Sequence, residues 1–160
     1  MIKPKNITWD NFWDVVNLKT SDFQKDFLPT NTVFMAQAYV NLKSGHPDSC
    51  FAICHNEEIV GFTKIEYVPK GLEPFDFSED TYYLDALMID EKHQGKGYGK
   101  LALMQILDFM KSKPWGDACS IKTACYDENS AAGRLYENFG FARTDGFISN
   151  RKGLRVYALS

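Results

Sequence analysis

A glycine-rich turn between an apolar strand-like run and an amphipathic helix-like run constrains the fold of this chain more than any other feature. It follows residues 82–89, precedes residues 100–110 and consists of Gln94, Gly95, Lys96, Gly97, Tyr98 and Gly99. Glycines at alternate positions tolerate the positive φ angles of a tight turn and let a ligand approach the backbone. Because the turn opens a helix, its free N–H groups point together, and Lys96 and Lys100 add positive charge. The turn therefore predicts a strand–turn–helix unit that binds an anion such as a pyrophosphate.

The spacing of this turn excludes two common phosphate-binding loops. A dinucleotide-binding fingerprint needs a third glycine where the chain has Lys100 or Ala102. A Walker A loop needs Ser or Thr where the chain has Leu101, and an earlier glycine where it has Gln94. Neither class of nucleotide site is therefore expected.

The spacing that does fit is Gln-x-x-Gly-x-Gly after a strand, carried by Gln94, Gly97 and Gly99. In these residues the chain resembles the GNAT superfamily of acyl-CoA-dependent N-acetyltransferases. Residues 129–141 (NSAAGRLYENFGF) resemble the second hallmark of that superfamily, in which Asn begins a helix and a Tyr precedes a Gly-Phe ending. Residues 24–39 and 84–100 further resemble bacterial spermine/spermidine acetyltransferases. The resemblance implies a mixed, mostly antiparallel sheet flanked by helices, with a β-α-β-α acyl-CoA-binding core, and it suggests a homodimer.

Length and composition suit one globular domain over residues 1–160, with 44% apolar residues. No apolar run reaches the roughly 18 residues of a membrane span, and the N-terminus lacks the apolar core of a signal peptide, so we expect a cytoplasmic protein without a membrane partner. The net charge of −3 argues against nucleic acid as a partner. The cysteine spacing matches no zinc pattern, which favours buried, reduced thiols and no metal over disulfides. The four cysteines are Cys50, Cys54, Cys119 and Cys125.

Hydrophobic periodicity outlines an α/β (α+β) domain around one mixed sheet. Helices are predicted over residues 11–19, from Pro29 to Ser44, over residues 100–110 and from Asn129 to Gly140. Strands are predicted over residues 50–54, 59–67, 82–89 and 119–126, around Phe141, and over residues 154–159. The second helix is expected to turn Val33, Ala36 and Val40 inward, and the third Leu103, Ile106, Leu107 and Met110.

The resemblance implies a site for acetyl-CoA on the strand and turn. The backbone groups of Leu87, Met88 and Ile89 would align the pantetheine arm as an added strand, and the residues from Gln94 to Lys100 would hold the pyrophosphate. Their apolar side chains can pack in the core at the same time. Asn129 either contacts the cofactor, as the resemblance implies, or only caps its helix.

The chemistry of acyl transfer to an amine calls for an acid and a base. The resemblance assigns the acid to Tyr136, which protonates the departing thiolate; the alternative is a core tyrosine. An alkylamine is only about one part in 10³ neutral at pH 7, so its proton needs an acceptor. Asp85 matches the carboxylate of eukaryotic polyamine acetyltransferases, although that residue is Glu there, and Glu66 is the second candidate. Water could accept the proton instead. The alternative interpretation of the two carboxylates is that they face solvent and have no catalytic role.

The acceptor is the least determined part of the prediction. A small primary amine, with a polyamine such as spermidine first, is the leading hypothesis. An aminoglycoside, an amino acid or a protein amine are alternatives, as is an acyl-CoA-binding module without catalysis. Four carboxylates in the loop over residues 68–80 either form an acidic mouth for a polycation or are merely solvated, namely Glu73, Asp76, Glu79 and Asp80. The lone His93 is expected to be exposed.

Overall fold

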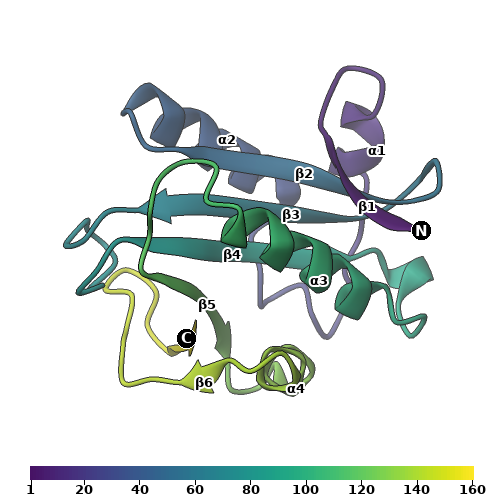
Figure 1. The fold of residues 1–160 in the computed structure, drawn as a ribbon. Coiled ribbons are helices and arrows are strands. Elements are labelled where there is room, and N and C mark those ends of the chain that lie inside the picture. The colour runs from purple at the N-terminus through teal and green to yellow at the C-terminus, as the bar shows by residue number, and fades with distance from the viewer.

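One seven-stranded sheet forms the centre of the molecule. The computed structural model describes residues 1–160, and Figure 1 shows its strands in the order β1-β2-β3-β4-β5-β7-β6. All neighbouring strands are antiparallel except β4 and β5, which are parallel. The strands are β1 (Ile2–Asn6), β2 (Asp48–His55), β3 (Glu58–Val68), β4 (Thr81–Ile89), β5 (Ser120–Tyr126), β6 (Ala142–Arg143) and β7 (Leu154–Leu159).

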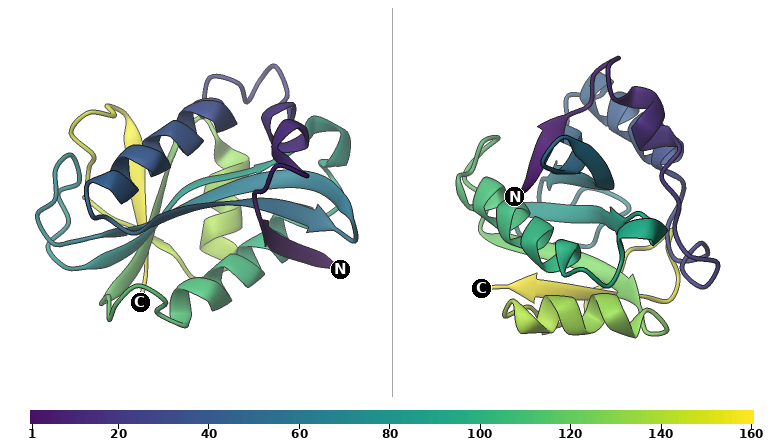
Figure 2. Two further views of the ribbon diagram at one scale, coloured as in Figure 1. Left: turned by 90° about the horizontal axis from the view of Figure 1, so that it is seen from above. Right: turned by 90° about the vertical axis from the view of Figure 1, so that its right-hand side faces the viewer.

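Helices cover both faces of the sheet, as Figure 2 shows. The helices α1 and α2 pack on one face, while α3 and α4 pack into a single core cluster on the other. Their bounds are α1 (Phe12–Val16), α2 (Asn31–Lys43), α3 (Tyr98–Lys111) and α4 (Ser130–Asn138), with a short 3-10 helix η1 (Glu91–His93) before the glycine turn. This architecture confirms the expected α/β class with a mixed, mostly antiparallel sheet. No helix is long and apolar enough to cross a membrane.

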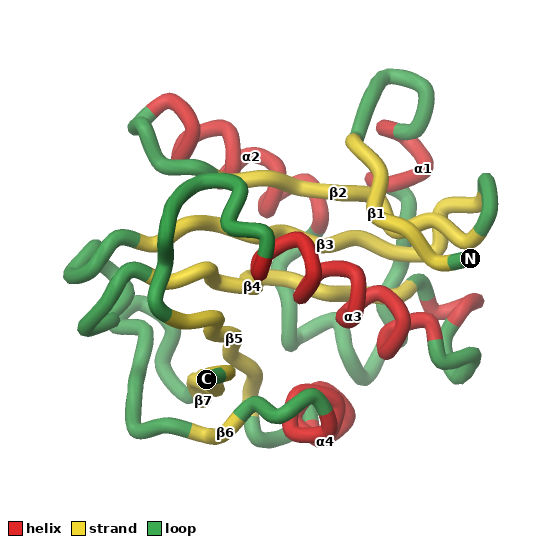
Figure 3. Tube along the Cα trace, viewed as in Figure 1, coloured by secondary structure: helices red, strands yellow, loops and turns green.

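The sheet opens between β4 and β5. The two strands pair only over Thr81–Leu84 and Ser120–Thr123. Beyond that point β5 continues to pair with β7 on its other side, whereas β4 has no partner on the side toward β5. Figure 3 shows β5 turning away from β4. The last five residues of β4 therefore present open backbone groups to the gap.

A β-bulge in β4 lies at the mouth of this gap. On β3, the adjacent residues Lys64 and Ile65 pair with Ala86 and Leu84, so Asp85 is the extra residue between them. Leu84 belongs to the core cluster beneath α3, whereas Ala86 belongs to the cluster beneath α1 and α2. Bulges re-aim side chains next to functional sites. Here the bulge places Asp85 beside Lys64 on the α2 face, with 2.8 Å between Asp85 Oδ2 and Lys64 Nζ.

The inward face predicted for α2 is wrong. Val33 and Val40 are 45% and 59% exposed, and Ala36 is exposed too. The helix is instead buried through Asn31, Phe34 and Ala38. The error has a physical cause: apolar residues occur all around this helix, while Asn31 points inward and donates to the carbonyl of Val15 at 3.0 Å. Periodicity alone cannot choose a face under those conditions.

The remaining elements follow the predictions with three differences. Strand β1 was not anticipated, and α1 is shorter than the predicted residues 11–19. All four cysteines are free thiols, but only Cys54 and Cys125 are buried as expected, whereas Cys50 is half-buried and Cys119 is exposed. The inward face predicted for α3 is confirmed, because Leu103, Ile106, Leu107 and Met110 are all buried.

Candidate functional site

A cleft of about 450 Å³ lies where β4, the glycine turn and α4 meet. This glycine-turn cleft is lined by all the residues proposed for the cofactor except Lys96, whose side chain is exposed. The proposed residues that line it are Leu87, Met88, Ile89, Gln94, Gly95, Gly97, Tyr98, Gly99, Lys100, Asn129 and Tyr136. Residues from three separate elements are thus brought together at the gap in the sheet.

The glycine turn presents free backbone amides to the cleft. Gly95 and Gly97 have φ angles of 75° and 79°, whereas Gly99 already lies within α3 and has no positive φ. Gly97 precedes α3 without a side-chain cap, and no hydrogen bond within the protein uses the amides of residues 95–100 as donors. These amides and the positive end of the α3 dipole favour an anion at this point.

Gln94 anchors the turn. Its side-chain amide donates hydrogen bonds to the carbonyl of Ile89 at 3.0 Å and to Gln24 Oε1 at 2.6 Å. The motif glutamine therefore fastens the turn to the end of β4 and to the segment before α2. Its nitrogen is already occupied by these contacts, so its part in the site is to hold the turn in shape.

Sequence reasoning missed one whole wall of the glycine-turn cleft. This wall comes from the segment over residues 20–28, which contributes Thr20, Gln24, Phe27 and Leu28. Part of this segment belongs to the resemblance over residues 24–39, but that resemblance assigned it no role in the cofactor site. His93 also lines the cleft, and the expectation that it is exposed is wrong, because its side chain is only 13% exposed and lies 3.2 Å from Glu58. From α4, Ala132 and Leu135 line the cleft.

Tyr136 is buried at the inner end of the cleft. It is 6% exposed and packs against Phe141 and Tyr157. Burial raises the pKa of its hydroxyl to about 12, while the neighbouring Thr123 side chain acts in the opposite direction. At neutral pH Tyr136 is therefore protonated and is a hydrogen-bond donor.

A small cavity of about 30 Å³ borders Tyr136. Its lining shares Leu87, Asn129 and Tyr136 with the glycine-turn cleft. It shares Asp85 and Arg151 with a second cavity on the α2 face of the sheet. This small cavity, here called the passage, therefore lies between the two larger cavities and shares wall residues with both, Tyr136 with the first and Asp85 with the second.

The second cavity, here called the polar cavity, has a volume of about 290 Å³. It contains both proposed base residues, together with aromatic and amide side chains. Its lining includes Asn41, Lys64, Glu66, Glu73, Phe75, Tyr83, Asp85 and Arg151. Of the four loop carboxylates proposed as an acidic mouth, only Glu73 is in this lining. Asp80 instead accepts hydrogen bonds from the Tyr67 hydroxyl and the Lys70 amide.

A buried charge cluster forms the floor of the polar cavity. Lys64 Nζ lies 2.8 Å from Asp85, 2.9 Å from Asp48 and 3.4 Å from Glu66. Glu66 also accepts a hydrogen bond from Asn41 of α2. Neither Asp85 nor Glu66 is a solvent-facing carboxylate, because their side chains are only 9% and 7% exposed.

Burial and mutual attraction set the protonation of this cluster. Burial lowers the pKa of Lys64, but the carboxylates of Asp85, Glu66 and Asp48 outweigh it and raise that pKa well above its ordinary value. Burial raises the pKa of Glu66 to about 7, against the opposing charge of Lys64. Lys64 therefore stays charged, and Glu66 exchanges a proton near neutral pH.

Comparison with known proteins identifies the family of this chain. A sequence model of the Acetyltransferase (GNAT) family matches residues 12–141. The spermine/spermidine N(1)-acetyltransferase of Bacillus subtilis (strain 168) is 28% identical over 141 residues, which are 88% of this chain and 87% of that protein.

Solved structures share the fold over the whole chain. Arabidopsis thaliana Naa50, in complex with the bisubstrate analogue CoA-Ac-MVNAL, has a TM-score of 0.67 at 20% identity and covers 99% of this chain and 98% of its own. The spermidine/spermine N-acetyltransferase SpeG from Vibrio cholerae has a TM-score of 0.63 at 17% identity, over 99% and 94% of the two chains. Since the family model spans most of the sequence and the fold agrees, this chain belongs to the GNAT family and is an N-acetyltransferase.

Proposed function

We propose that this protein transfers an acetyl group from acetyl-CoA to a primary amine of a small molecule, by direct attack of the amine on the thioester. The observation that carries the proposal is the passage between the two cavities, which has Tyr136 on one side and Asp85 on the other. The donor would lie in the glycine-turn cleft and the acceptor in the polar cavity. Their reacting atoms would meet in the passage.

The glycine-turn cleft suits the donor in two respects. The free amides of residues 95–100, together with Lys100, would bind the pyrophosphate. The open edge of β4 at Leu87–Ile89 would pair with the amide groups of the pantetheine arm. Asn129 accepts a hydrogen bond from the Ala132 amide at 3.4 Å and so caps α4, which leaves its own side-chain nitrogen free to donate to the arm.

Tyr136 would stabilise the leaving thiolate as the carbon–sulfur bond breaks. A thiol pKa near 8.5 lies about 3.5 units below that of Tyr136, so complete proton transfer from the phenol is uphill by roughly 5 kcal/mol. Hydrogen-bond donation requires no such transfer. Tyr136 therefore acts first as a donor to the developing negative charge, and the sulfur takes its final proton as the product leaves.

The proton of the amine would leave through the charge cluster. Asp85 borders both the passage and the polar cavity, so it is placed to accept the proton from the attacking nitrogen, directly or through water. Glu66 pairs with the same lysine as Asp85, namely Lys64. Its pKa of about 7 suits a group that accepts the proton from Asp85. The two carboxylates would thus act in sequence.

A polyamine such as spermidine is the first acceptor to test. Two observations support it: the activity in the name of the Bacillus subtilis relative, and the carboxylates of Glu66, Glu73 and Asp85 around the polar cavity. The rings of Phe75 and Tyr83 line the same cavity and suit the methylene chain of such a molecule.

The test is free-thiol release from acetyl-CoA with spermidine, spermine, lysine and an aminoglycoside as acceptors. We expect release with spermidine and spermine. Thiol release with lysine or the aminoglycoside alone would contradict the hypothesis that the acceptor is a polyamine, but it would still support acetyl transfer to an amine. Tight CoA binding without thiol release from any amine would show a binding module instead. The homodimer stays a prediction, which sedimentation velocity would test.

A further inference from the structure

Arg151 occupies a position between the two halves of the site. It lies in the loop between β6 and β7, and its side chain is 25% exposed. Arg151 borders both the passage and the polar cavity, whereas Lys152 of the same loop borders neither. Its backbone amide donates to the carbonyl of Ile148, which fixes the turn that carries it. A positive charge is therefore held where the acceptor amine would lie in the proposed reaction.

The guanidinium of Arg151 has hydrogen-bonding capacity to spare. Its nearest carboxylate is Asp85, at 3.5 Å between Nη1 and Oδ1, and its side chain donates no hydrogen bond within the protein. Asp85 already pairs with Lys64 at 2.8 Å through its other oxygen. Lys64 shares its single charge with Asp48 and Glu66, so Arg151 is a second cation beside Asp85. A guanidinium has five N–H donors in a planar fork that matches a carboxylate, and these donors remain available.

The charge of Arg151 opposes one class of acceptor and suits another. A polycation entering the polar cavity meets this guanidinium and is repelled by it. An acceptor with a carboxylate beside its amine gains two contacts, since the amine can face Asp85 while the carboxylate faces Arg151. The 3.5 Å separation of those two groups matches an amine and a carboxylate carried on one carbon atom.

We propose that Arg151 is a specificity-determining residue that binds a carboxylate next to the acceptor amine and so favours amino acids over plain polyamines. The proposal rests on the proposed acetyl transfer. It adds a residue that sets the relative rates of two classes of acceptor, whichever of them the wild-type protein prefers.

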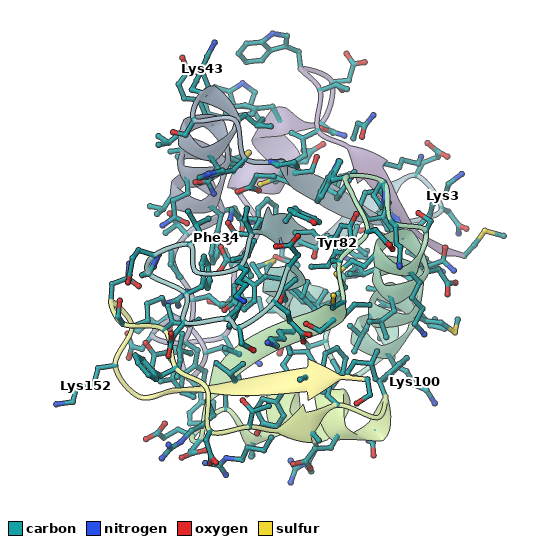
Figure 4. The ribbon with its side chains drawn as sticks, turned by 60° about the vertical axis from the view of Figure 1, so that its left-hand side comes forward. Lys3, Phe34, Lys43, Tyr82, Lys100 and Lys152 are labelled. Atoms are coloured by element: carbon teal, nitrogen blue, oxygen red, sulfur yellow. The ribbon has the colours of Figure 1, made fainter.

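The test compares acceptors that differ in the carboxylate alone. Lysine and cadaverine share the same diamine chain, and lysinamide keeps the atoms of lysine but removes the negative charge. The variant is Arg151→Gln, and the matched control is Lys152→Gln, which removes the same charge from the next residue. Lys152 is exposed, borders neither the passage nor the polar cavity, and points away from the molecule in Figure 4.

We expect the ratio of kcat/KM for lysine to that for cadaverine to fall about 10- to 100-fold in Arg151→Gln, as the loss of a charge-assisted bidentate contact predicts. Lysinamide should follow cadaverine, and Lys152→Gln should leave every ratio within about twofold. An unchanged ratio in Arg151→Gln would overturn the proposal. Equal losses for all acceptors would also overturn it, because they would indicate a structural role.

Binding measured by calorimetry in the presence of CoA separates this proposal from the proposed reaction. An Arg151-dependent preference for lysine over lysinamide, without any thiol release, would support the role of Arg151 and refute the transfer. Thiol release without an Arg151-dependent difference in binding or kcat/KM would refute the role of Arg151 and leave the transfer standing.

Discussion

The two cavities of this molecule are built in different ways. The polar groups that the glycine-turn cleft presents are largely backbone, namely the amides of residues 95–100 and the open edge of β4. The polar cavity is formed by side chains, with carboxylates and cations supplied by β2, β3, β4 and the loop before β7. A backbone site depends on a few consecutive residues, while a side-chain site depends on how distant segments pack. The first can stay constant while the second changes with the acceptor.

Tyr136→Phe tests the point where the two cavities meet, and its effect should be the largest. We expect turnover to fall by about 10² to 10⁴, because the thiolate loses its hydrogen-bond donor, while acetyl-CoA affinity stays nearly unchanged. Thiol-release kinetics and calorimetry measure the two quantities. Tyr157→Phe is the control, since Tyr157 is buried beside Tyr136 but lines neither cavity. Unchanged turnover in Tyr136→Phe would remove this residue from the mechanism.

Gly97→Glu tests the backbone cavity alone. We expect acetyl-CoA affinity to fall about 100-fold or more, because a carboxylate would occupy the anion position at the start of α3. Gly71→Glu is the matched control, since both glycines have positive φ angles of 79° and 72° and open space around an added side chain. Equal losses in the two variants, measured by calorimetry, would mean that strain rather than charge is responsible. Retained affinity in Gly97→Glu would show that the donor binds elsewhere.

Glu66→Gln tests the side-chain cavity through its dependence on pH. The pKa of Glu66 is raised by burial from its ordinary value of 4.5 to about 7, so its contribution to stability is complete below pH 4.5 and is lost as the pH rises through 7. From pH 5 to pH 8 the wild type should therefore lose up to about 3 kcal/mol of unfolding free energy relative to Glu66→Gln. Urea unfolding at both pH values measures the difference.

The control for this measurement is Glu128→Gln, which changes an exposed carboxylate between β5 and α4. It should change the unfolding free energy equally at pH 5 and pH 8. A parallel pH dependence of the wild type and Glu66→Gln would place the titrating group elsewhere in the charge cluster.

The strand, turn and helix of the glycine-turn cleft could be predicted from the sequence, because the residues that determine them are consecutive in the chain. The strand, the turn and α3 follow one another along the chain, and the free amides follow from the glycines at 95 and 97. The sheet class and the inward face of α3 were predicted for the same reason. Even there, the segment over residues 20–28 was invisible, since contacts such as that between Gln24 and Gln94 carry no pattern.

The side-chain cavity was predicted only as isolated candidates. Asp85 and Glu66 were identified, but not the lysine that holds them, because Lys64 in an amphipathic strand looks like a solvent-facing residue. The bulge at Asp85 is equally hidden, since an extra residue in one strand is defined only by its partner strand. Asn41 of α2 donates a hydrogen bond to Glu66 and so completes the cavity, whereas periodicity predicted that the opposite face of this helix points inward.

The gap beside β4 has a further consequence for how the protein behaves among its neighbours. The last residues of β4 form a free strand edge in the interior of a sheet, and free edges are templates for pairing with other chains. Phe27, Leu28, Ala132 and Leu135 line the cleft at this edge. Covering a strand edge with neighbouring segments is one of the ways in which proteins prevent such pairing. The residues that line the glycine-turn cleft would thus also hinder aggregation through the free edge of β4.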